Sequence, residues 1–194
     1  NPWCARARGL ASLAAGGAAT SGAFYREDLL QTILRWHDAE PFDAVLTYCT
    51  GMFRYARELM QLPAGRAPSR HVLDLVDVDS EKWSQLAPQA GAAKRWVYRA
   101  EARRLRPIEA GRLGPVDAMA VVSEREAALY RRVVRADAPL RVVENGVDLD
   151  YWRPLPDCSE PTLVFAGVLD YEPNVDGLEW FVRDVLPRVR SRTP

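Results

Sequence analysis

The sequence is poor in the side chains that form disulfides or bind transition metals. Its 194 residues include three cysteines and two histidines. Cys4, Cys49 and Cys158 lie far apart and form no C-x-x-C pair, which favours a reducing compartment over a disulfide framework. With only His37 and His71 as imidazole ligands, a zinc site of the usual kind is not expected.

Net charge and long hydrophobic runs are also lacking. Lys plus Arg and Asp plus Glu both total 26, so the formal net charge of zero gives no reason to expect a nucleic-acid partner. There is no run of about 18 apolar residues, which excludes a transmembrane helix of ordinary length. A hydrophobic content of 48% and a charged content of 27% are typical of a globular protein with a real core. With the scattered cysteines, these properties predict a cytoplasmic protein.

Short apolar runs alternate with amphipathic segments along most of the chain. The runs predict strands at residues 42–49, 71–76, 116–122 and 140–148, and the segments between them predict helices at 27–39, 50–61, about 79–87, 92–112 and from 123 onward. Residues 1–25 are small and polar and are expected to be irregular. Strands that alternate with helices predict an α/β fold with a Rossmann-like parallel sheet.

A proline-rich stretch divides this pattern. We expect residues 1–150 to form one domain and residues 151–161, with three prolines, to be a semi-rigid linker. The pattern then restarts in residues 162–194, which we interpret as the first βα unit of a second domain. "TLVFAGVL" predicts a strand and turn, and the helix that follows has Asn174 as its expected cap and Pro187 as its expected kink or end.

The stretch "DLVDVDSEKW" (74–83) carries four carboxylates and one lysine directly after an apolar run. Asp77 and Asp79 form a D-x-D pattern, which can hold a divalent cation through hard oxygen ligands. Alternatively, Asp79 or Ser80 caps the next helix and Lys82 is solvated. A third interpretation is a substrate loop at the end of a strand.

Two further polar motifs follow predicted strands. Ser123 and Glu126 form an S-x-x-E capping box at the start of a helix. Asn145-Gly146 is typical of a tight turn, and Asp148 offers a carboxylate close by. Because parallel sheets bind ligands beyond the carboxyl ends of their strands, we expect the motifs at 77–83, 123–126 and 144–148 to share one edge.

The stretch "FAGVLDYEPN" (165–174) is a strand-turn-helix candidate. Gly167 would let a ligand approach the backbone closely, and the N-terminus of the following helix could receive a phosphate. A bare structural turn explains the same letters.

The order of these motifs resembles the retaining glycosyltransferases of the GT-B fold, of the group 1 or family 4 type. The resemblance rests on "VVSEREAALY", "ENGVDLDYWRP" and "LVFAGVLDYEPNVDGLEWFVRDVLPRVR". "DLVDVDSEKWSQLA" and "WVYRAEARRLRPIEA" are similar to the sugar transferases of exosortase and exopolysaccharide systems. The resemblance covers residues 70–192 well and residues 21–60 loosely.

The resemblance implies two Rossmann-like domains, with a nucleotide-sugar donor bound mainly by the C-terminal domain and a glycan or lipid-linked acceptor mainly by the N-terminal one. Such enzymes need no metal and no further cofactor. It places Asp77 as the candidate catalytic residue, which orients an acceptor hydroxyl or accepts its proton. Asp79 and Lys82 would bind substrate beside it, with Lys82 contacting a phosphate.

The same resemblance assigns substrate-binding positions outside this loop. Ser123 and Glu124 would lie near the cleft, and Asn145 and Gly146 would form the turn of the N-G-V-D motif. Asp148 would belong to the hinge region rather than to the chemistry.

In the second domain, the resemblance implies that Gly167 lies near the donor diphosphate and that Asn174 caps a helix facing the cleft. The family's donor-binding acids would follow residue 194, and its first strand would precede residue 1. We therefore interpret the chain as the middle of an enzyme of roughly twice its length, and expect no transferase activity from it alone. Two other hypotheses are a non-enzymatic Rossmann-like binding module and a metal-dependent transferase that uses Asp77 and Asp79.

One basic segment, "KRWVYRAEARRLR" (94–106), fits none of these motifs. Basic amphipathic helices can lie on anionic membranes, so peripheral contact with the inner membrane is one interpretation. A solvated face on a packed helix is the other.

Overall fold

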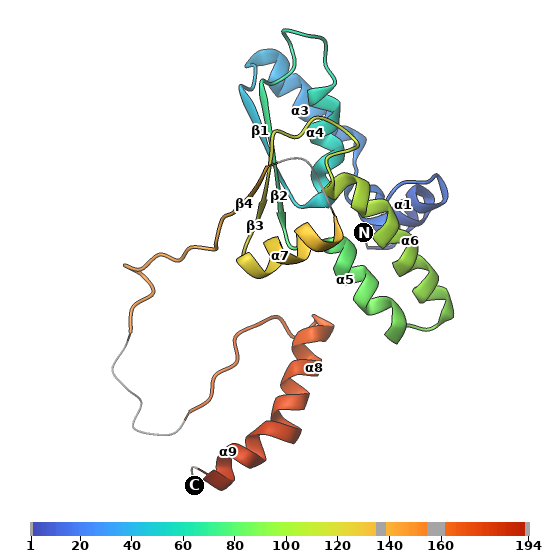
Figure 1. Ribbon diagram of the computed structural model, residues 1–194. Coiled ribbons are helices and arrows are strands. Elements are labelled where there is room, and N and C mark those ends of the chain that lie inside the picture. Colours follow the sequence, from blue (N-terminus) through green and yellow to red (C-terminus); the bar gives the residue numbers. More distant parts are fainter. Residues whose placement is uncertain (1, 135–138, 155–161, 193–194) are drawn as a thin grey trace. The chain divides into compact units, whose positions relative to one another are not determined.

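Four parallel strands form the sheet in the computed structural model of the chain, which describes residues 2–134, 139–154 and 162–192 (Figure 1). They are β1 (Ala44–Tyr48), β2 (Arg70–Val76), β3 (Ala118–Val121) and β4 (Leu140–Val142), and they lie in the order β1-β2-β3-β4. The predicted α/β fold with a Rossmann-like parallel sheet is confirmed. The last strand is shorter than predicted, because only one further pairing, from the Val143 N–H to the Val121 carbonyl at 2.9 Å, extends the ladder toward residue 148.

Helices connect the strands where the periodicity predicts them. They are α4 (Phe53–Met60) after a 3₁₀ turn at Thr50–Met52, α5 (Asp79–Leu86) followed by a 3₁₀ turn at Ala87–Gln89, α6 (Ala92–Glu109) and α7 (Glu124–Val133). Helix α3 (Glu27–Ala39), also predicted, precedes β1. Pro107 lies in the last turn of α6 without ending it. Each strand-helix-strand connection steps to the next strand in the same direction. Because such crossovers are right-handed, the connecting helices collect on one face of the sheet.

The core lies between this face and the helices. Leu73, Leu75, Met119 and Val121 point to it and pack with apolar side chains of the helices, which include Phe53, Leu105, Ile108, Ala127 and Tyr130. Alternate residues of each strand point to the other face, where Leu46 and Tyr48 of β1 are 72% and 65% exposed. The sheet is therefore buried on one side only in the part of the chain that the structure describes.

The N-terminal segment is helical, so the prediction of an irregular segment at residues 1–25 was wrong. It forms α1 (Pro2–Ala14) and α2 (Ala19–Phe24), which pack closely together. Alanine, frequent in this segment, is the strongest helix former. A Cβ at Gly22 would collide with the Ser12 side chain, so the absence of a side chain there permits the close approach. The small residues that suggested a loop are instead the packing surface of a helical hairpin.

The chain divides into two compact units, Asn1–Gly146 and Val147–Pro194. In the second unit, the strand predicted at residues 162–169 is absent, because no neighbouring strand within the described residues pairs with its backbone groups. Helix α8 (Glu172–Trp180) continues through a π-helical stretch, Phe181–Val185, into α9 (Leu186–Arg192). Of the expected linker, residues 155–161 lie outside the described residues.

Pro187 neither ends this helix nor leaves it regular. Proline has no backbone N–H, and in a regular α-helix its ring would clash with the carbonyl four residues earlier, that of Arg183. Arg183 lies within the π-helical stretch Phe181–Val185, where the helix departs from α-helical geometry. Within the described residues, no helix combines the length and the apolar character needed to cross a bilayer.

Candidate functional site

Two adjacent strands end in backbone conformations that side chains other than glycine rarely adopt. Cys49, directly after β1, has a φ of 61°, and Val76, the last residue of β2, has a φ of 65°. For a β-branched residue such as Val76 this conformation is a genuine outlier. Strained residues persist where the surrounding structure holds them, and they cluster at functional sites. Both lie at the carboxyl edge of the sheet, where the sequence places its polar motifs.

The loop from β2 to α5 is folded back on itself by short-range hydrogen bonds. The Asp74 carboxylate accepts from the Val76 N–H at 3.0 Å, and the Asp77 N–H donates to the Leu75 carbonyl at 2.8 Å. The Asp79 N–H then donates to the Asp77 carbonyl at 3.1 Å. These bonds use the backbone of the loop and leave the Asp77 side chain exposed to solvent.

One interpretation of the sequence expected Asp79 to cap α5, and this expectation was wrong. The N-cap position belongs to Val78, and no side chain of this segment caps the helix. The Asp79 carboxylate instead accepts a hydrogen bond from the Thr50 hydroxyl at 2.7 Å. It thereby ties the end of β1 to the start of α5, which is a structural task.

Carboxylates from two other helices bind the first amides of α5. Glu126 of α7 accepts from the Val78 N–H at 3.0 Å, and Glu109 of α6 accepts from the Ser80 N–H at 2.8 Å. Negative charge at a helix N-terminus is favourable because it satisfies free N–H groups and opposes the helix dipole. The orientation of the loop that carries Asp77 is thus set by α6 and α7.

Glu109 is fully buried beneath this loop. Its Oε2 atom and the nearby Ser80 Oγ atom have no hydrogen-bond partner within the described residues. Burial is the main reason that the pKa of the Glu109 carboxyl is raised, to about 7; Ser80 opposes this rise, the neighbouring Asp79 charge adds to it, and Arg106 lowers the pKa slightly. A carboxyl that titrates near neutrality therefore underlies the site.

Ser123 caps α7 as predicted, because its Oγ accepts from the Glu126 N–H at 3.2 Å. The second half of the predicted capping box is absent, since the Glu126 carboxylate binds Val78 instead of turning back to Ser123. Glu124 is exposed and lies 3.9 Å from Arg131. The S-x-x-E motif therefore joins the second and third strand ends of the sheet.

An open hollow of about 640 Å³ lies between the β2–α5 segment and α7. Asp77, Glu81 and Lys82 line it from one side, and Arg125 and Arg132 line it from the other. The structure thus brings together Asp77 and Lys82, as predicted, and adds two arginines that the sequence analysis missed. Their spacing of seven residues, which puts them on one face of a helix, was the available signal. The site presents cations beside an exposed carboxylate.

The turn motif after β4 lies outside this hollow. Asn145 and Gly146 are exposed, and neither is among the residues that line it. Asp148, in the second unit, accepts hydrogen bonds from the Asp150 and Tyr151 N–H groups at 2.9 and 3.1 Å. Its carboxylate therefore closes a local turn.

In the second unit, Gly167 and Asn174 are close neighbours. A Cβ at Gly167 would lie 3.0 Å from the Asn174 side-chain nitrogen and 2.9 Å from the Phe165 ring. The prediction that Asn174 caps α8 was wrong, because Tyr171 occupies the N-cap position. Its side-chain amide donates to the Val168 carbonyl at 3.0 Å and so fixes the preceding turn.

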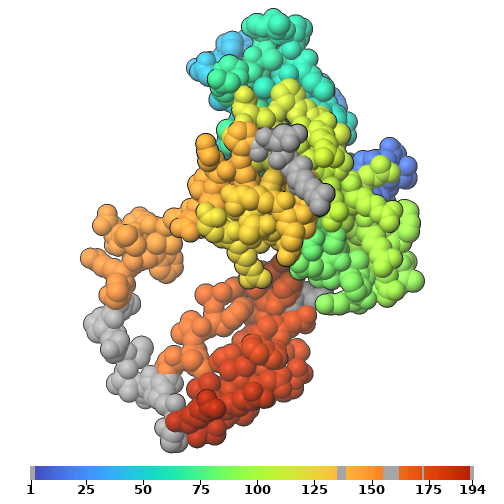
Figure 2. All heavy atoms as spheres, viewed as in Figure 1, coloured from blue at the N-terminus to red at the C-terminus, as the bar shows by residue number. Residues whose placement is uncertain are grey.

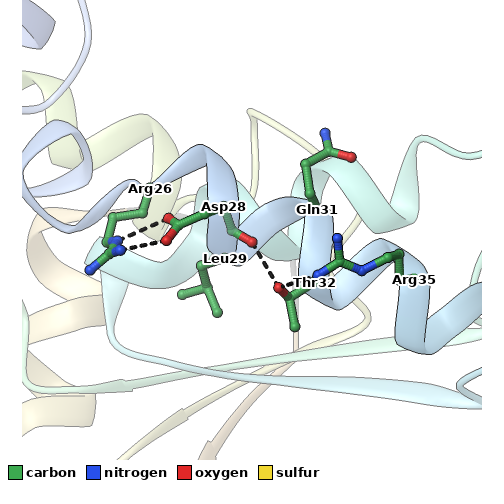
Figure 3. A pocket seen from close by; sticks show the side chains of 6 residues that line it. All are labelled: Arg26, Asp28, Leu29, Gln31, Thr32 and Arg35. Atoms are coloured by element: carbon green, nitrogen blue, oxygen red, sulfur yellow. Dashed lines mark hydrogen bonds and ion pairs between the residues drawn. The ribbon is translucent and has the colours of Figure 1, made fainter.

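A second hollow, of about 370 Å³, lies along α3 and contains none of the predicted site residues. Figure 3 shows its lining, in which Arg26 and Asp28 form an ion pair and the Arg35 guanidinium donates to the Thr32 hydroxyl at 3.0 Å. Arg26 and Asp28 already engage each other and Arg35 engages a neighbouring hydroxyl, so the hollow offers no unengaged charged group among its described lining residues.

No group of three or more His, Cys, Asp or Glu side chains suited to hold a metal occurs within the described residues. The metal-dependent hypothesis therefore has no third protein ligand there to join Asp77 and Asp79. Comparisons with protein-family models, with curated proteins and with solved structures found no match to this chain.

Proposed function

We propose that the first unit is the acceptor-binding half of a glycosyltransferase that uses a nucleotide-sugar donor. The acceptor would be a glycan or lipid-linked precursor of an exopolysaccharide, modified on the cytoplasmic side of the membrane. The observation that carries the proposal is the hollow between α5 and α7, where the exposed Asp77 lies beside Lys82 and across from Arg125 and Arg132. This hollow lies at the carboxyl edge of a parallel sheet, the usual ligand position of such folds.

Each side chain of the hollow has a chemical role in this proposal. Asp77, exposed and held on a strained loop, would orient an acceptor hydroxyl or accept its proton. Lys82, Arg125 and Arg132 would bind the phosphate groups of a lipid-linked acceptor or of the departing nucleotide, since guanidinium groups bind phosphate in a bidentate manner. Transfer with retention would gain most from electrostatic stabilisation of the leaving diphosphate.

The remaining assignments of the resemblance are part of the same proposal. Ser123, Glu124, Asn145 and Gly146 border the acceptor side, and Asp148 belongs to the hinge. Gly167 and Asn174, which pack against each other in the second unit, would lie near the donor diphosphate. No metal takes part.

The test begins with the coding DNA on both sides of the segment. The protein encoded by the whole reading frame is then assayed for nucleoside diphosphate release from a panel of nucleotide sugars, with a polyprenyl-diphosphate-linked acceptor present. Asp77→Asn is expected to lower kcat by about a hundredfold or more, the usual contribution of a proton acceptor. The control is Asp43→Asn, an exposed aspartate before β1, at the other end of the sheet.

Absence of turnover with every nucleotide sugar, or equal turnover by Asp77→Asn and the control, would contradict the proposal. The 194-residue chain alone is expected to show no turnover with any donor.

One observation favours the alternative of a non-enzymatic binding module. Every buried side chain among the described residues belongs to the first unit, which therefore has its own core. A reading frame that starts just before Asn1 and stops after Pro194 would make this alternative the leading one.

A further inference from the structure

Helix α6 exposes positive charge and no negative charge. It carries six cations, Lys94, Arg95, Arg99, Arg103, Arg104 and Arg106, and every one of them is exposed. Its two acids, Glu101 and Glu109, are both buried and bind backbone amides of other elements. The surface of this helix is therefore cationic, although the chain as a whole has a formal net charge of zero. Figure 2 shows this segment, in yellow-green, on the outer surface of the first unit.

Three of the arginines form a stripe with an exposed tryptophan. Arg95, Arg99 and Arg103 follow one another at intervals of four residues, so they lie on one side of the helix over roughly 12 Å. Trp96 lies beside them and is 65% exposed. With Ala92 and Ala100, these four residues line an open hollow of about 350 Å³. The two small alanines leave the space between the long side chains.

The charge of the stripe is not neutralised by neighbouring acids. Arg99 and Arg103 form no ion pair within the described residues, and Arg95 donates only to backbone carbonyls, those of Pro88 and Ala90. Among the described residues, the one ion pair of this helix joins Arg106 to Glu81 at 3.9 Å. Two exposed cations elsewhere in the first unit, Arg66 and Arg70, do have carboxylate partners, Asp38 and Asp117.

We propose that this stripe docks the protein on the surface of an anionic phospholipid bilayer. The hollow between Arg95, Arg99 and Arg103 suits the phosphate of a lipid headgroup, because guanidinium groups bind phosphate with directed hydrogen bonds. Trp96 would enter the headgroup region, which tryptophan favours because its ring is apolar and its N–H is polar. The inference does not depend on the glycosyltransferase proposal, since it uses no residue of the hollow between α5 and α7.

The test is flotation of the 194-residue chain with vesicles of phosphatidylcholine alone or mixed with phosphatidylglycerol. Binding is expected only to the mixed vesicles and is expected to weaken with salt. Each cation near an anionic surface strengthens binding roughly fivefold, so replacing Arg95, Arg99 and Arg103 by Gln should weaken it about a hundredfold. Trp96→Ala should weaken it about tenfold, through the loss of its interfacial ring.

The matched control replaces three exposed arginines on separate elements, Arg35, Arg112 and Arg141, by Gln. It removes the same net charge and should retain most of the binding. Equal losses in the two triple variants, or absence of binding to mixed vesicles at low salt, would overturn the proposal. So would tighter binding to poly(U) than to mixed vesicles at physiological salt, which would point to single-stranded RNA.

Discussion

At the scale of single residues, Glu109 couples the candidate site to pH. Its folded-state pKa of about 7 lies above the ordinary value for glutamate, because burial penalises the carboxylate. A group whose pKa is raised on folding contributes its full stability below the unfolded pKa and loses it as the pH rises through the folded pKa. The window is therefore about pH 4.5 to 7, and the free energy lost across it is about 3 kcal/mol.

Glu109→Gln is expected to remove this pH dependence. The amide oxygen can still accept from the Ser80 N–H, while the side chain no longer titrates. The variant should match the parent near pH 5 and exceed its free energy of unfolding by up to about 3 kcal/mol near pH 8. Urea denaturation at several pH values between these limits measures the difference.

Glu40→Gln is the control, since Glu40 is exposed at the end of α3. It should shift the free energy of unfolding equally little at every pH. If the free energy of unfolding of Glu109→Gln runs parallel to that of the parent between pH 5 and pH 8, Glu109 is ionised throughout this range. If the variant is less stable than the parent at every pH, the neighbours of Glu109 hold it as a carboxylate.

At the scale of elements, carboxylates of α6 join segments that are distant in the sequence. Glu101, which is buried, accepts hydrogen bonds from the Ala19 and Thr20 N–H groups, the latter at 2.8 Å. These amides form the first turn of α2, whose N-cap residue, Ala18, has no side-chain oxygen to offer. Glu101 therefore supplies the cap that the local sequence lacks.

Glu101→Ala is expected to detach the α1–α2 hairpin from the rest of the first unit. Two amides would lose a charged acceptor in a buried position, at a cost of about 2 kcal/mol. Amide hydrogen exchange should accelerate in α1 and α2 while the amides of β2 and β3 keep their protection. Glu101→Gln, which retains one acceptor oxygen, should lie between the parent and the alanine variant. Uniform acceleration across hairpin and sheet would mean that the hairpin is part of the main cooperative unit.

The sequence predicted the elements better than their ends. Periodicity located the four strands of the sheet and its connecting helices, because each has one apolar face. It failed where partners are distant in the sequence. The cap of α5 was assigned to Asp79 or Ser80, whereas Glu109 and Glu126 bind its first amides. Asp77 and Lys82 were predicted as neighbours because one loop carries both, but Arg125 reaches their hollow only through the pairing of β2 with β3.

At the scale of the whole molecule, the two units differ in how they bury apolar surface. The buried side chains of the described residues all lie in Asn1–Gly146. In the second unit, Trp180, Val182 and Val189 of the α8–α9 helix are exposed, and no described side chain is buried. An amphipathic helix gains most of its stability from packing that face against another element. The second unit is therefore expected to contribute little to the folding free energy of this chain.

Residues 1–146 produced alone should therefore melt as the 194-residue chain does, with a Tm changed by less than about 4 °C. The reason is that the core of α4, α6, α7 and the sheet lies entirely within this range. Residues 147–194 alone should show no cooperative transition, because they bury no side chain among those described. Calorimetry of the three chains measures this. The control is a chain that ends at residue 119, which lacks half of β3 (Ala118–Val121) and all of α7 and β4, and which should show no transition. A Tm that falls by much more than this limit would mean that the second unit packs on the first and completes its core. That result would weaken the alternative of a self-contained binding module.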